Sequence, residues 1–277
     1  MSYSINCKGK LLSLETPLVM GILNVTPDSF YDGGKYAAKE AAIAQAEKML
    51  QEGAAIIDVG GMSSKPGNKI ISIEEELNRV LPVIESILEQ YPEAVISIDT
   101  LNAEVAAKAV GKGASMVNDI TAGKYDAEML LTVAELQVPF IAMHMKGLPE
   151  NMMQHTNYND LVVEVFDYFA ERIYACKQHG IADVIIDPGF GFFSKTMEQN
   201  YELLRNLESF KALGKPMLVG VSRKSMIKKL LEVTGEEALN GTTAVNMLAL
   251  TQGANILRVH DVKEAVEAIK VFNAFSN

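Results

Sequence analysis

Eight short apolar runs, rich in β-branched residues, recur along the chain at intervals of roughly 20 to 45 residues. In order they read LVMGIL, AAIIDV, AVISID, ASMVN, VPFIAM, DVIID, PMLVGV and ANILRV. Near-continuous apolar runs of this length are typical of strands that are buried on both faces, as in a parallel sheet. The pattern therefore predicts eight parallel strands.

The segments between these runs place apolar residues three and four positions apart among charged residues, which predicts amphipathic helices. The expected helices cover residues 37–52, 73–90, 103–111, 127–136, 158–179, 198–213, 238–253 and 262–275. Eight such βα units close more naturally into a barrel than into an open sheet. An open dinucleotide-binding sheet would also carry GxGxxG after its first strand, and this sequence does not. The predicted fold class is α/β, a (β/α)8 TIM barrel.

The segment before the first strand, SINCKGKLLSL, is interpreted as two short strands that turn at Lys8 and Gly9. Glycine tolerates the backbone that a tight hairpin turn requires. We expect a short N-terminal β-hairpin that covers the floor of the barrel. No linker or low-complexity tract divides the sequence, so residues 1–277 are expected to form a single domain.

Composition limits the functions that this chain can have. Hydrophobic residues make up 48% of the sequence and charged residues 22%, which is typical of a globular protein with a sizeable core. The formal net charge of −10 argues against nucleic acid as a partner, so an anionic ligand must meet a local cluster of Lys and Arg.

The sequence also gives expectations about the compartment. It has no apolar run of about 18 residues that could span a membrane, and its start lacks the apolar stretch of a signal peptide. The only two cysteines, Cys7 and Cys176, stand far apart, which favours reduced thiols. We expect a cytoplasmic protein with no membrane partner.

Polar residues stand at the carboxyl ends of several predicted strands, where (β/α)8 barrels carry their chemistry. Side chains two positions apart share one face of a strand, so Arg258 and His260 can reach the same ligand. The other polar strand ends that this alternation selects are Asn24, Asp99, Asn118 and Asp187. The cations of VSRKS follow the seventh strand. Cations beside an amide oxygen suit a phosphate-bearing substrate with a hard metal ion.

The residues alone leave other interpretations open. Polar residues at strand ends are often turn residues or helix N-caps, and Asp261 fits such a cap. Arg258 lies in an apolar strand, where a guanidinium must pair with an acid or bind an anion. Arg223 and Lys224 stand near a helix start, so they either extend into water or meet an anion. His144 is either a site residue or a packed core histidine.

Two loops, TPDSFYDGGKY after the first strand and GGMSSKPGNK after the second, differ in composition from structural turns. Both combine glycines with hydroxyl, cationic or aromatic side chains. We interpret them as lids over the mouth of the barrel, and the alternative is that they are solvated connectors.

Taken in order, the motifs of this chain resemble the dihydropteroate synthase family over nearly the whole sequence. They are MGILNVTPDSFYDGG, DVGGMSSKPG, SIDT, VNDITAG, MHMKG, IDPGFGF, GVSRKS, and NGTTA followed by ANILRVHDV. The resemblance implies a homodimeric (β/α)8 barrel that takes part in folate biosynthesis. Such an enzyme joins 6-hydroxymethyl-7,8-dihydropterin diphosphate to p-aminobenzoate, assisted by Mg2+, and releases pyrophosphate and 7,8-dihydropteroate.

The resemblance also implies roles for single residues. Those that match the pterin-binding residues of the family are Asp99, Asn118, Asp187 and Lys224. Those that match its diphosphate ligands are Asn24, Arg258 and His260, and Asn24 also matches the metal ligand. The p-aminobenzoate pocket would consist of Ser64, Lys65, Pro66, Phe192 and Ser222. The residues expected to act in catalysis are Asp99, Lys224, Arg258 and His260.

The sequence departs from the family pattern around the p-aminobenzoate pocket. The second loop has Met62, Ser64 and Lys65 where the family usually has Glu, Thr and Arg, and FGFFSKT is one residue longer near Phe193. Lysine does not reproduce the bidentate contact of a guanidinium. We therefore expect altered contacts with p-aminobenzoate and with the sulfonamides that mimic it.

Three other functions fit parts of the sequence. A pterin-binding methyltransferase barrel would share the acid and amide contacts but would have little use for the cations of SRK and RVH. A non-catalytic pterin-binding paralogue would keep the pocket with an altered second loop. A phosphate-binding sugar isomerase barrel would carry a glycine-rich loop in place of VSRKS and RVHDV.

Overall fold

The computed structural model describes residues 3–26, 34–62, 70–148, 151–191 and 194–276. Its central strands are β3 (Leu18–Asn24), β4 (Ile56–Gly60), β5 (Ile96–Asp99), β6 (Met116–Asp119), β7 (Phe140–Met143), β8 (Val184–Asp187), β9 (Leu218–Val219) and β10 (Ile256–Val259). They pair in the order β8-β7-β6-β5-β4-β3-β10-β9, and all these pairs are parallel. A parallel bridge between Ile186 and Met217 links the two edge strands, so the sheet forms a nearly closed barrel.

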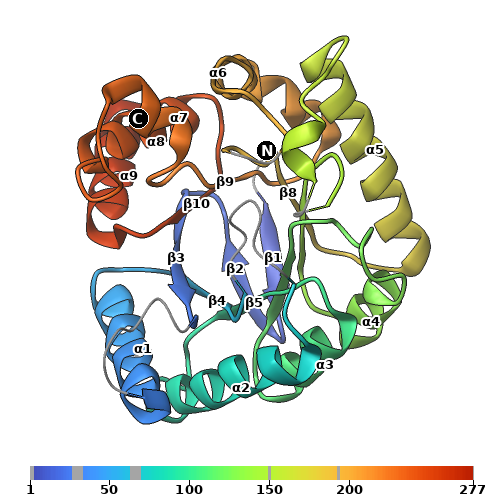
Figure 1. The fold of residues 1–277 in the computed structure, drawn as a ribbon, viewed down its shortest axis with the longest axis vertical. Helices are drawn as coiled ribbons and strands as arrows, with labels where there is room; N and C mark the ends of the chain where they lie inside the picture. Colours follow the sequence, from blue (N-terminus) through green and yellow to red (C-terminus); the bar gives the residue numbers. More distant parts are fainter. Residues whose placement is uncertain (1–2, 27–33, 63–69, 149–150, 192–193, 277) are drawn as a thin grey trace.

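Helices form a ring around these strands (Figure 1). They are α1 (Gly34–Gln51), α2 (Ile73–Gln90), α3 (Ala103–Gly111), α4 (Met129–Leu136), α5 (Leu161–His179), α6 (Met197–Arg205), α7 (Ser225–Leu231), α8 (Leu239–Thr251) and α9 (Val262–Ser276). The described residues also form two 3-10 helices, η2 (Met152–Gln154) and η3 (Leu207–Leu213). The predicted (β/α)8 fold is confirmed. None of the described helices is long and apolar enough to cross a membrane.

Two helix predictions need correction. The expected helix over residues 198–213 is two elements, because α6 ends at Arg205 and the 3-10 helix η3 follows over Leu207–Leu213. The sequence predicted a helix start near Arg223 and Lys224 but gave no bounds for the short helix α7, which lies between β9 and α8. Seven residues make only two turns, which is too short for the apolar period to stand out in the sequence.

The strands are buried on both faces, as their apolar sequences predict. One set of side chains packs against the helices, including Val19, Ile57, Ile98 and Leu257. The alternate set fills the interior of the barrel near its floor and consists of Met20, Ile56, Val95, Met116, Ile141, Ile185, Leu218 and Ile256. Because side chains alternate along a strand, the residues two positions after this second set also point inward, nearer the mouth.

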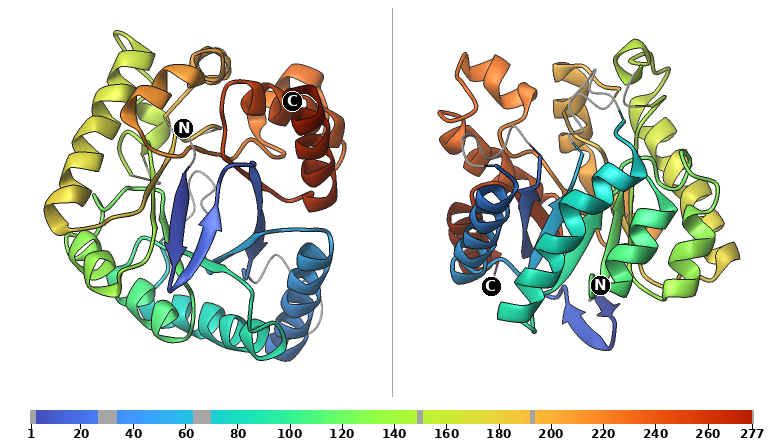
Figure 2. Two further views of the ribbon diagram at one scale, coloured as in Figure 1. Left: turned by 180° about the vertical axis from the view of Figure 1, so that it is seen from behind. Right: turned by 60° about the horizontal axis from the view of Figure 1, so that its bottom comes forward.

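A β-hairpin closes the floor of the barrel, as the sequence predicts. Strands β1 (Ser4–Cys7) and β2 (Lys10–Ser13) are antiparallel, and the turn residues Lys8 and Gly9 have φ angles of 53° and 92°. Ile5 joins the apolar layer of the floor, and the Asn6 backbone N–H donates to Asp183 Oδ2 at 2.8 Å. Figure 2 shows the hairpin at one end of the barrel, below the strands in its right-hand view.

Replacing Ile5 with Ala tests the role of this hairpin. Ile5 is 2% exposed, so its truncation leaves a cavity in the floor and should lower the free energy of unfolding by about 2 to 5 kcal/mol. Chemical denaturation monitored by circular dichroism measures the loss. The matched control is Leu11→Ala on the same hairpin, because Leu11 is 72% exposed and its truncation should cost no more than about 0.5 kcal/mol. Equal losses in the two variants would contradict this role.

Candidate active site

A buried ion-pair cluster lies one layer above the floor of the barrel. Arg258 of β10 donates through Nε to Asp58 Oδ2 of β4 at 2.6 Å, and through Nη2 to Asp99 Oδ2 of β5 at 2.7 Å. The Asp58 side chain has no exposed surface, and that of Asp99 is 15% exposed. Two carboxylates therefore share one guanidinium at the carboxyl ends of the strands.

The shared guanidinium sets the ionisation of this cluster. Burial raises the pKa of Asp99 to about 7, and repulsion by Asp58 adds to this effect against the attraction of Arg258. Burial disfavours the charge of Arg258, but Asp58 and Asp99 outweigh it and hold the pKa of Arg258 above its usual range. The cluster thus keeps a permanent cation beside a carboxyl group that titrates near neutral pH.

The two predicted amides lie beside these acids. Asn118 ends β6 and donates through Nδ2 to Asp58 Oδ2 at 3.0 Å. Asn24 ends β3, and a Cβ placed on Gly60 would lie 3.6 Å from Asp99 Oδ2 and 3.7 Å from Asn24 Oδ1. Both oxygens therefore flank the same inward-facing glycine, which keeps this part of the mouth open to a ligand.

Lys224 and Asp187 form the opposite part of the mouth. The Lys224 ammonium lies 3.8 Å from a Cβ placed on Gly220, and Cβ of Arg258 lies 3.7 Å from the same point. Burial lowers the pKa of Lys224 to about 8, while the nearby Asp187 carboxylate opposes this shift. Burial likewise raises the pKa of Asp187, against the attraction of Lys224 and Arg258. Asp187 and Arg258 thus face the same interior.

His260 is held by Ser222, which follows β9. The Ser222 hydroxyl lies 3.1 Å from His260 Nδ1 and accepts the His260 backbone N–H at 3.2 Å. The hydroxyl oxygen already accepts one N–H and its proton can be donated to Nδ1, so we assign the ring proton to Nε2. Burial lowers the pKa of His260 to about 4, and Arg258 adds to the shift. His260 is therefore a neutral N–H donor at neutral pH.

Arg223 meets an anion of the protein itself, the carboxylate of Asp261. The interpretation in which its side chain simply extends into water is therefore wrong. Its guanidinium donates through Nε to Asp261 Oδ2 at 3.0 Å and through Nη2 to Asp261 Oδ1 at 2.5 Å. The Asp261 carboxylate lies at the start of α9 and holds this guanidinium. The pair ties the loop after β9 to the end of β10 and so places Ser222 and Lys224 near Arg258.

Three buried residues at the mouth were absent from the predicted site. Asp58 is inward-facing and two positions after Ile56, so strand alternation in AAIIDV could have found it. His144 is 1% exposed and packs edge-on against Tyr168, with 4.8 Å between ring centroids, so the interpretation as a packed histidine is confirmed. Lys195 lies beside it and is 2% exposed. No pattern in the sequence distinguishes Lys195 from a surface lysine.

Part of the predicted site lies outside the described residues. These residues are Ser64, Lys65, Pro66 and Phe192 of the p-aminobenzoate pocket, together with Phe193. Most of the two loops interpreted as lids, residues 27–33 and 63–69, also lies there. Of the expected pocket, Ser222 is described, and it contacts His260. The assignment of the other four residues stays a prediction.

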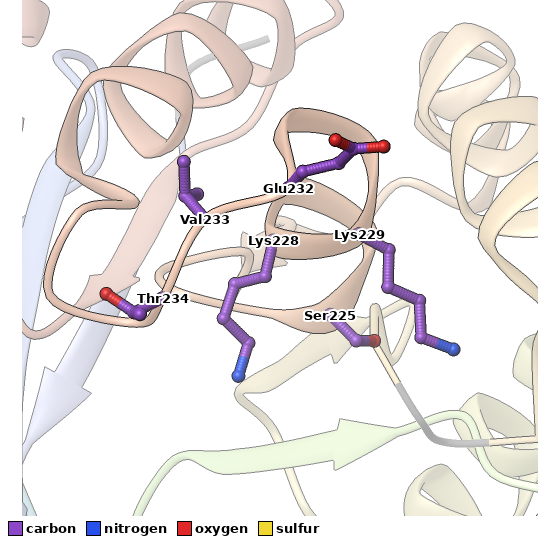
Figure 3. A pocket seen from close by; sticks show the side chains of 6 residues that line it. All are labelled: Ser225, Lys228, Lys229, Glu232, Val233 and Thr234. Carbon is purple, nitrogen blue, oxygen red and sulfur yellow. The ribbon is translucent and has the colours of Figure 1, made fainter.

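A surface pocket of about 340 Å³ lies on α7, apart from the cluster around Arg258. It is lined by Ser225, Lys228, Lys229, Glu232, Val233 and Thr234. Figure 3 shows the two lysine side chains extending away from the helix. The lining includes none of the predicted site residues. The chemistry is therefore expected at the barrel mouth and not in this pocket.

Fold and site together define a (β/α)8 barrel enzyme with acids, amides and cations at one mouth. The family model described as "Pterin binding enzyme" matches residues 20–260. Dihydropteroate synthase of Escherichia coli (strain K12) is 47% identical over 269 residues, which are 96% of this chain and 94% of that protein. The chain therefore belongs to the pterin-binding enzymes and, within them, to the dihydropteroate synthases.

Solved structures of other family members have the same fold. Xanthomonas albilineans dihydropteroate synthase with 4-aminobenzoic acid superposes with a TM-score of 0.93 at 42% identity, covering 100% of this chain and 99% of that one. Yersinia pestis dihydropteroate synthase in a sulfonamide complex gives a TM-score of 0.93 at 40% identity and covers 99% of both chains. The resemblance stated from the motifs is thus confirmed across the whole chain.

Proposed function

We propose that this chain uses the barrel mouth to join 6-hydroxymethyl-7,8-dihydropterin diphosphate to p-aminobenzoate, as a dihydropteroate synthase of folate biosynthesis. The observation that supports this most is the contact of Arg258 with Asp99, because it brings an acid and a cation from distant segments into one site. The products are 7,8-dihydropteroate and pyrophosphate. The enzyme is a transferase.

The acids and amides of the mouth bind the pterin. Carboxylates accept hydrogen bonds, so Asp99 and Asp187 take up the N–H groups of the flat ring and its exocyclic amine. Asn118 offers an amide from β6 beside Asp58. Lys224 donates a charged hydrogen bond to a ring oxygen or nitrogen from the other side of the interior. These four residues come from the ends of different strands and the loop after β9, so they surround one space.

The diphosphate lies toward β3 and β10. Arg258 supplies a permanent positive charge, and neutral His260 supplies an N–H group from Nε2. The N-terminus of α9 adds backbone donors, which favour a bound anion. Asn24 offers an amide oxygen beside the same space. The anionic end of the substrate thus meets donors while its ring meets acceptors.

Asn24 also fits a role as a magnesium ligand. The Asn24 amide oxygen and the Asp99 carboxylate flank Gly60, and hard oxygen donors are those that Mg2+ prefers. Among the described residues, no group of three or more His, Cys, Asp or Glu could hold a metal ion, so diphosphate and water oxygens would supply most ligands. When bound, Mg2+ would neutralise charge on the leaving diphosphate.

Catalysis follows from the opposite charges at the two ends of this pocket. When the bond between the pterin methylene and the diphosphate breaks, positive charge develops on carbon and negative charge on the departing oxygen. Asp99 and Asp187 stabilise the first, and Arg258 and His260 stabilise the second. The amine of p-aminobenzoate then attacks the methylene carbon. An arylammonium loses its proton readily to water, so we assign no dedicated general base.

The p-aminobenzoate pocket is proposed to lie above this site, with Ser222 at its inner side. Ser64, Lys65, Pro66 and Phe192 complete it by resemblance to the family. Lys65 and the extra residue near Phe193 should change the contacts that p-aminobenzoate and sulfonamides make.

We also propose a homodimer that works in the cytoplasm. Several of the large hydrophobic residues that the described chain exposes lie on the consecutive helices α7, α8 and α9, namely Leu230, Leu231, Leu248, Val271 and Phe275. An apolar surface of this kind suits association with a second copy. Light scattering is expected to give twice the chain mass of 30.2 kDa, and a monomeric mass would contradict the dimer.

A pyrophosphate-release assay tests the proposed function. The chain is incubated with the pterin diphosphate, p-aminobenzoate and Mg2+, and the expected result is release that requires all three. Omitting p-aminobenzoate and chelating Mg2+ are the controls. Binding of the pterin without release would instead identify a non-catalytic pterin-binding protein, and no binding at all would rule out the proposed site.

The pH dependence of kcat/KM for the pterin diphosphate tests two of the proposed roles. Asp99 acts as a carboxylate, so activity should fall as pH drops through about 7. Lys224 acts as a cation, so activity should fall as pH rises through about 8. In Lys224→Arg, the alkaline limb should move above pH 9, because arginine does not titrate there. Ionisation of the substrate affects the unaltered enzyme and Lys224→Arg alike. An alkaline limb at the same pH in both would therefore exclude deprotonation of Lys224 as the cause of that limb.

A further inference from the structure

The turn that follows β8 carries Asp187 into the mouth, and its backbone is bound on several sides. The Gly189 N–H donates to Asp187 Oδ1 at 2.8 Å, which fixes the orientation of that carboxylate. Asn200 of α6 pairs with both polar groups of Gly191, accepting its N–H at 2.6 Å and donating to its carbonyl at 3.0 Å. The turn therefore has little freedom to move independently of the residues that hold it.

Two lysines hold consecutive carbonyl groups of this turn. Lys224 Nζ donates to the Phe190 carbonyl at 2.5 Å, and Lys195 Nζ donates to the Gly189 carbonyl at 3.1 Å. Lys224 belongs to the proposed pterin site. Lys195 is 2% exposed and belongs to none of the proposed substrate sites, so no role in the chemistry above explains why a lysine is buried there.

His144 at the end of β7 is the second partner of Lys195. Nζ of Lys195 lies 2.9 Å from His144 Nδ1, and burial holds the pKa of His144 well below its usual range. A neutral imidazole accepts this hydrogen bond through Nδ1. Tyr168 and Phe169 pack around the ring, so the acceptor is fixed in position.

Burying the ammonium group of Lys195 costs free energy, so an interaction in the folded protein must compensate for this cost. Burial lowers the pKa of Lys195 to about 7, and the Asp187 carboxylate opposes this shift. Lys195 in turn helps to offset the burial that raises the pKa of Asp187. The lysine therefore acts on Asp187 in two ways, through the backbone of the turn and through its charge.

We infer that Lys195, held by His144, is a positioning residue that sets the affinity of the site for the pterin by fixing Asp187 and its turn. The inference rests on the proposed function of the barrel mouth. Lys195 donates to the backbone of the turn that orients Asp187, so its loss should act mainly on pterin binding and much less on p-aminobenzoate binding.

The test is Lys195→Met, which keeps the length of the side chain but removes its charge and donors. The KM of the pterin diphosphate should rise about 10- to 100-fold, as expected for loss of charged hydrogen bonds, with the KM of p-aminobenzoate within about twofold of the original. Lys195→Gln retains an amide donor, so its KM for the pterin diphosphate should lie between those of the unaltered enzyme and Lys195→Met. The matched control is Lys108→Met on α3, because Lys108 is exposed and pairs only with the exposed Glu104 among described residues.

The outcomes separate this inference from the proposed function. If the unaltered enzyme does not release pyrophosphate with p-aminobenzoate, the proposed function fails whatever Lys195 does. If it does, an unchanged KM for the pterin diphosphate in folded Lys195→Met, or an equal rise for both substrates, overturns the inference. Should Lys195→Met not fold, Lys195→Gln decides: a selective rise in the KM of the pterin diphosphate supports the positioning role, and unchanged constants overturn it.

Discussion

Replacement of Asp99 with Asn is expected to remove most turnover while leaving the protein as stable as before, or slightly more stable. Asparagine has nearly the same shape but lacks the negative charge that favours the developing cation on the pterin. The loss in kcat/KM should be about 100- to 1000-fold, similar to the loss of one group that stabilises transition-state charge. Steady-state pyrophosphate release with the pterin diphosphate as the varied substrate measures it.

The stability expectation for this variant follows from the charges of the cluster. Asp58 and Asp99 share a single guanidinium, so removing one carboxylate leaves a balanced pair between Arg258 and Asp58. Repulsion between the acids disappears, and thermal unfolding should occur at an unchanged or higher temperature. Asp167→Asn on the exposed side of α5 is the matched control. Near-normal kcat/KM in Asp99→Asn would remove Asp99 from the mechanism.

Replacement of Arg258 with Met is expected to abolish turnover and also to destabilise the fold. Methionine removes every donor that Arg258 offers to the diphosphate and leaves Asp58 and Asp99 without their cation. Removing one partner of a buried ion pair typically costs about 3 to 5 kcal/mol. Urea denaturation and the same kinetic assay measure the two losses separately.

The loss of stability in Arg258→Met should depend on pH. Without the guanidinium, the folded-state pKa of Asp99, which burial already raises, lies further above its pKa in the unfolded chain. Ionisation of Asp99 then opposes folding more strongly than in the unaltered protein, so the difference in stability should be small at pH 5 and large at pH 8. The control is Arg205→Gln, because Arg205 is exposed on α6. A pH-independent difference would mean that the lost stability comes from packing and not from unpaired acids.

The strand alternation in the sequence predicted much of this architecture. Arg258, Asp99 and Asp187 each lie two or more positions along the strand from an apolar residue of the barrel floor, and the structure places all three inside the mouth. The hairpin was also predictable, because the turn at Lys8 and Gly9 has the left-handed backbone that glycine favours.

Other features depend on tertiary contacts that local patterns do not encode. Arg223 could not be assigned from its place near a helix start, because its partner Asp261 stands 38 residues later. Lys195 resembles a surface lysine until the fold brings it against His144, 51 positions earlier. Helix α7 was predicted only as a helix start near Arg223 and Lys224, because its seven residues are too few to establish a period.

A crystal structure of the complex with the pterin diphosphate would show whether both ends of this substrate bind at one mouth of the barrel. We expect the pterin ring within hydrogen-bond distance of Asp99, Asn118 and Asp187, with the diphosphate against Arg258 and His260 at the same mouth. A ligand bound in the pocket on α7, or with its diphosphate directed at Asp187 and away from Arg258, would contradict it.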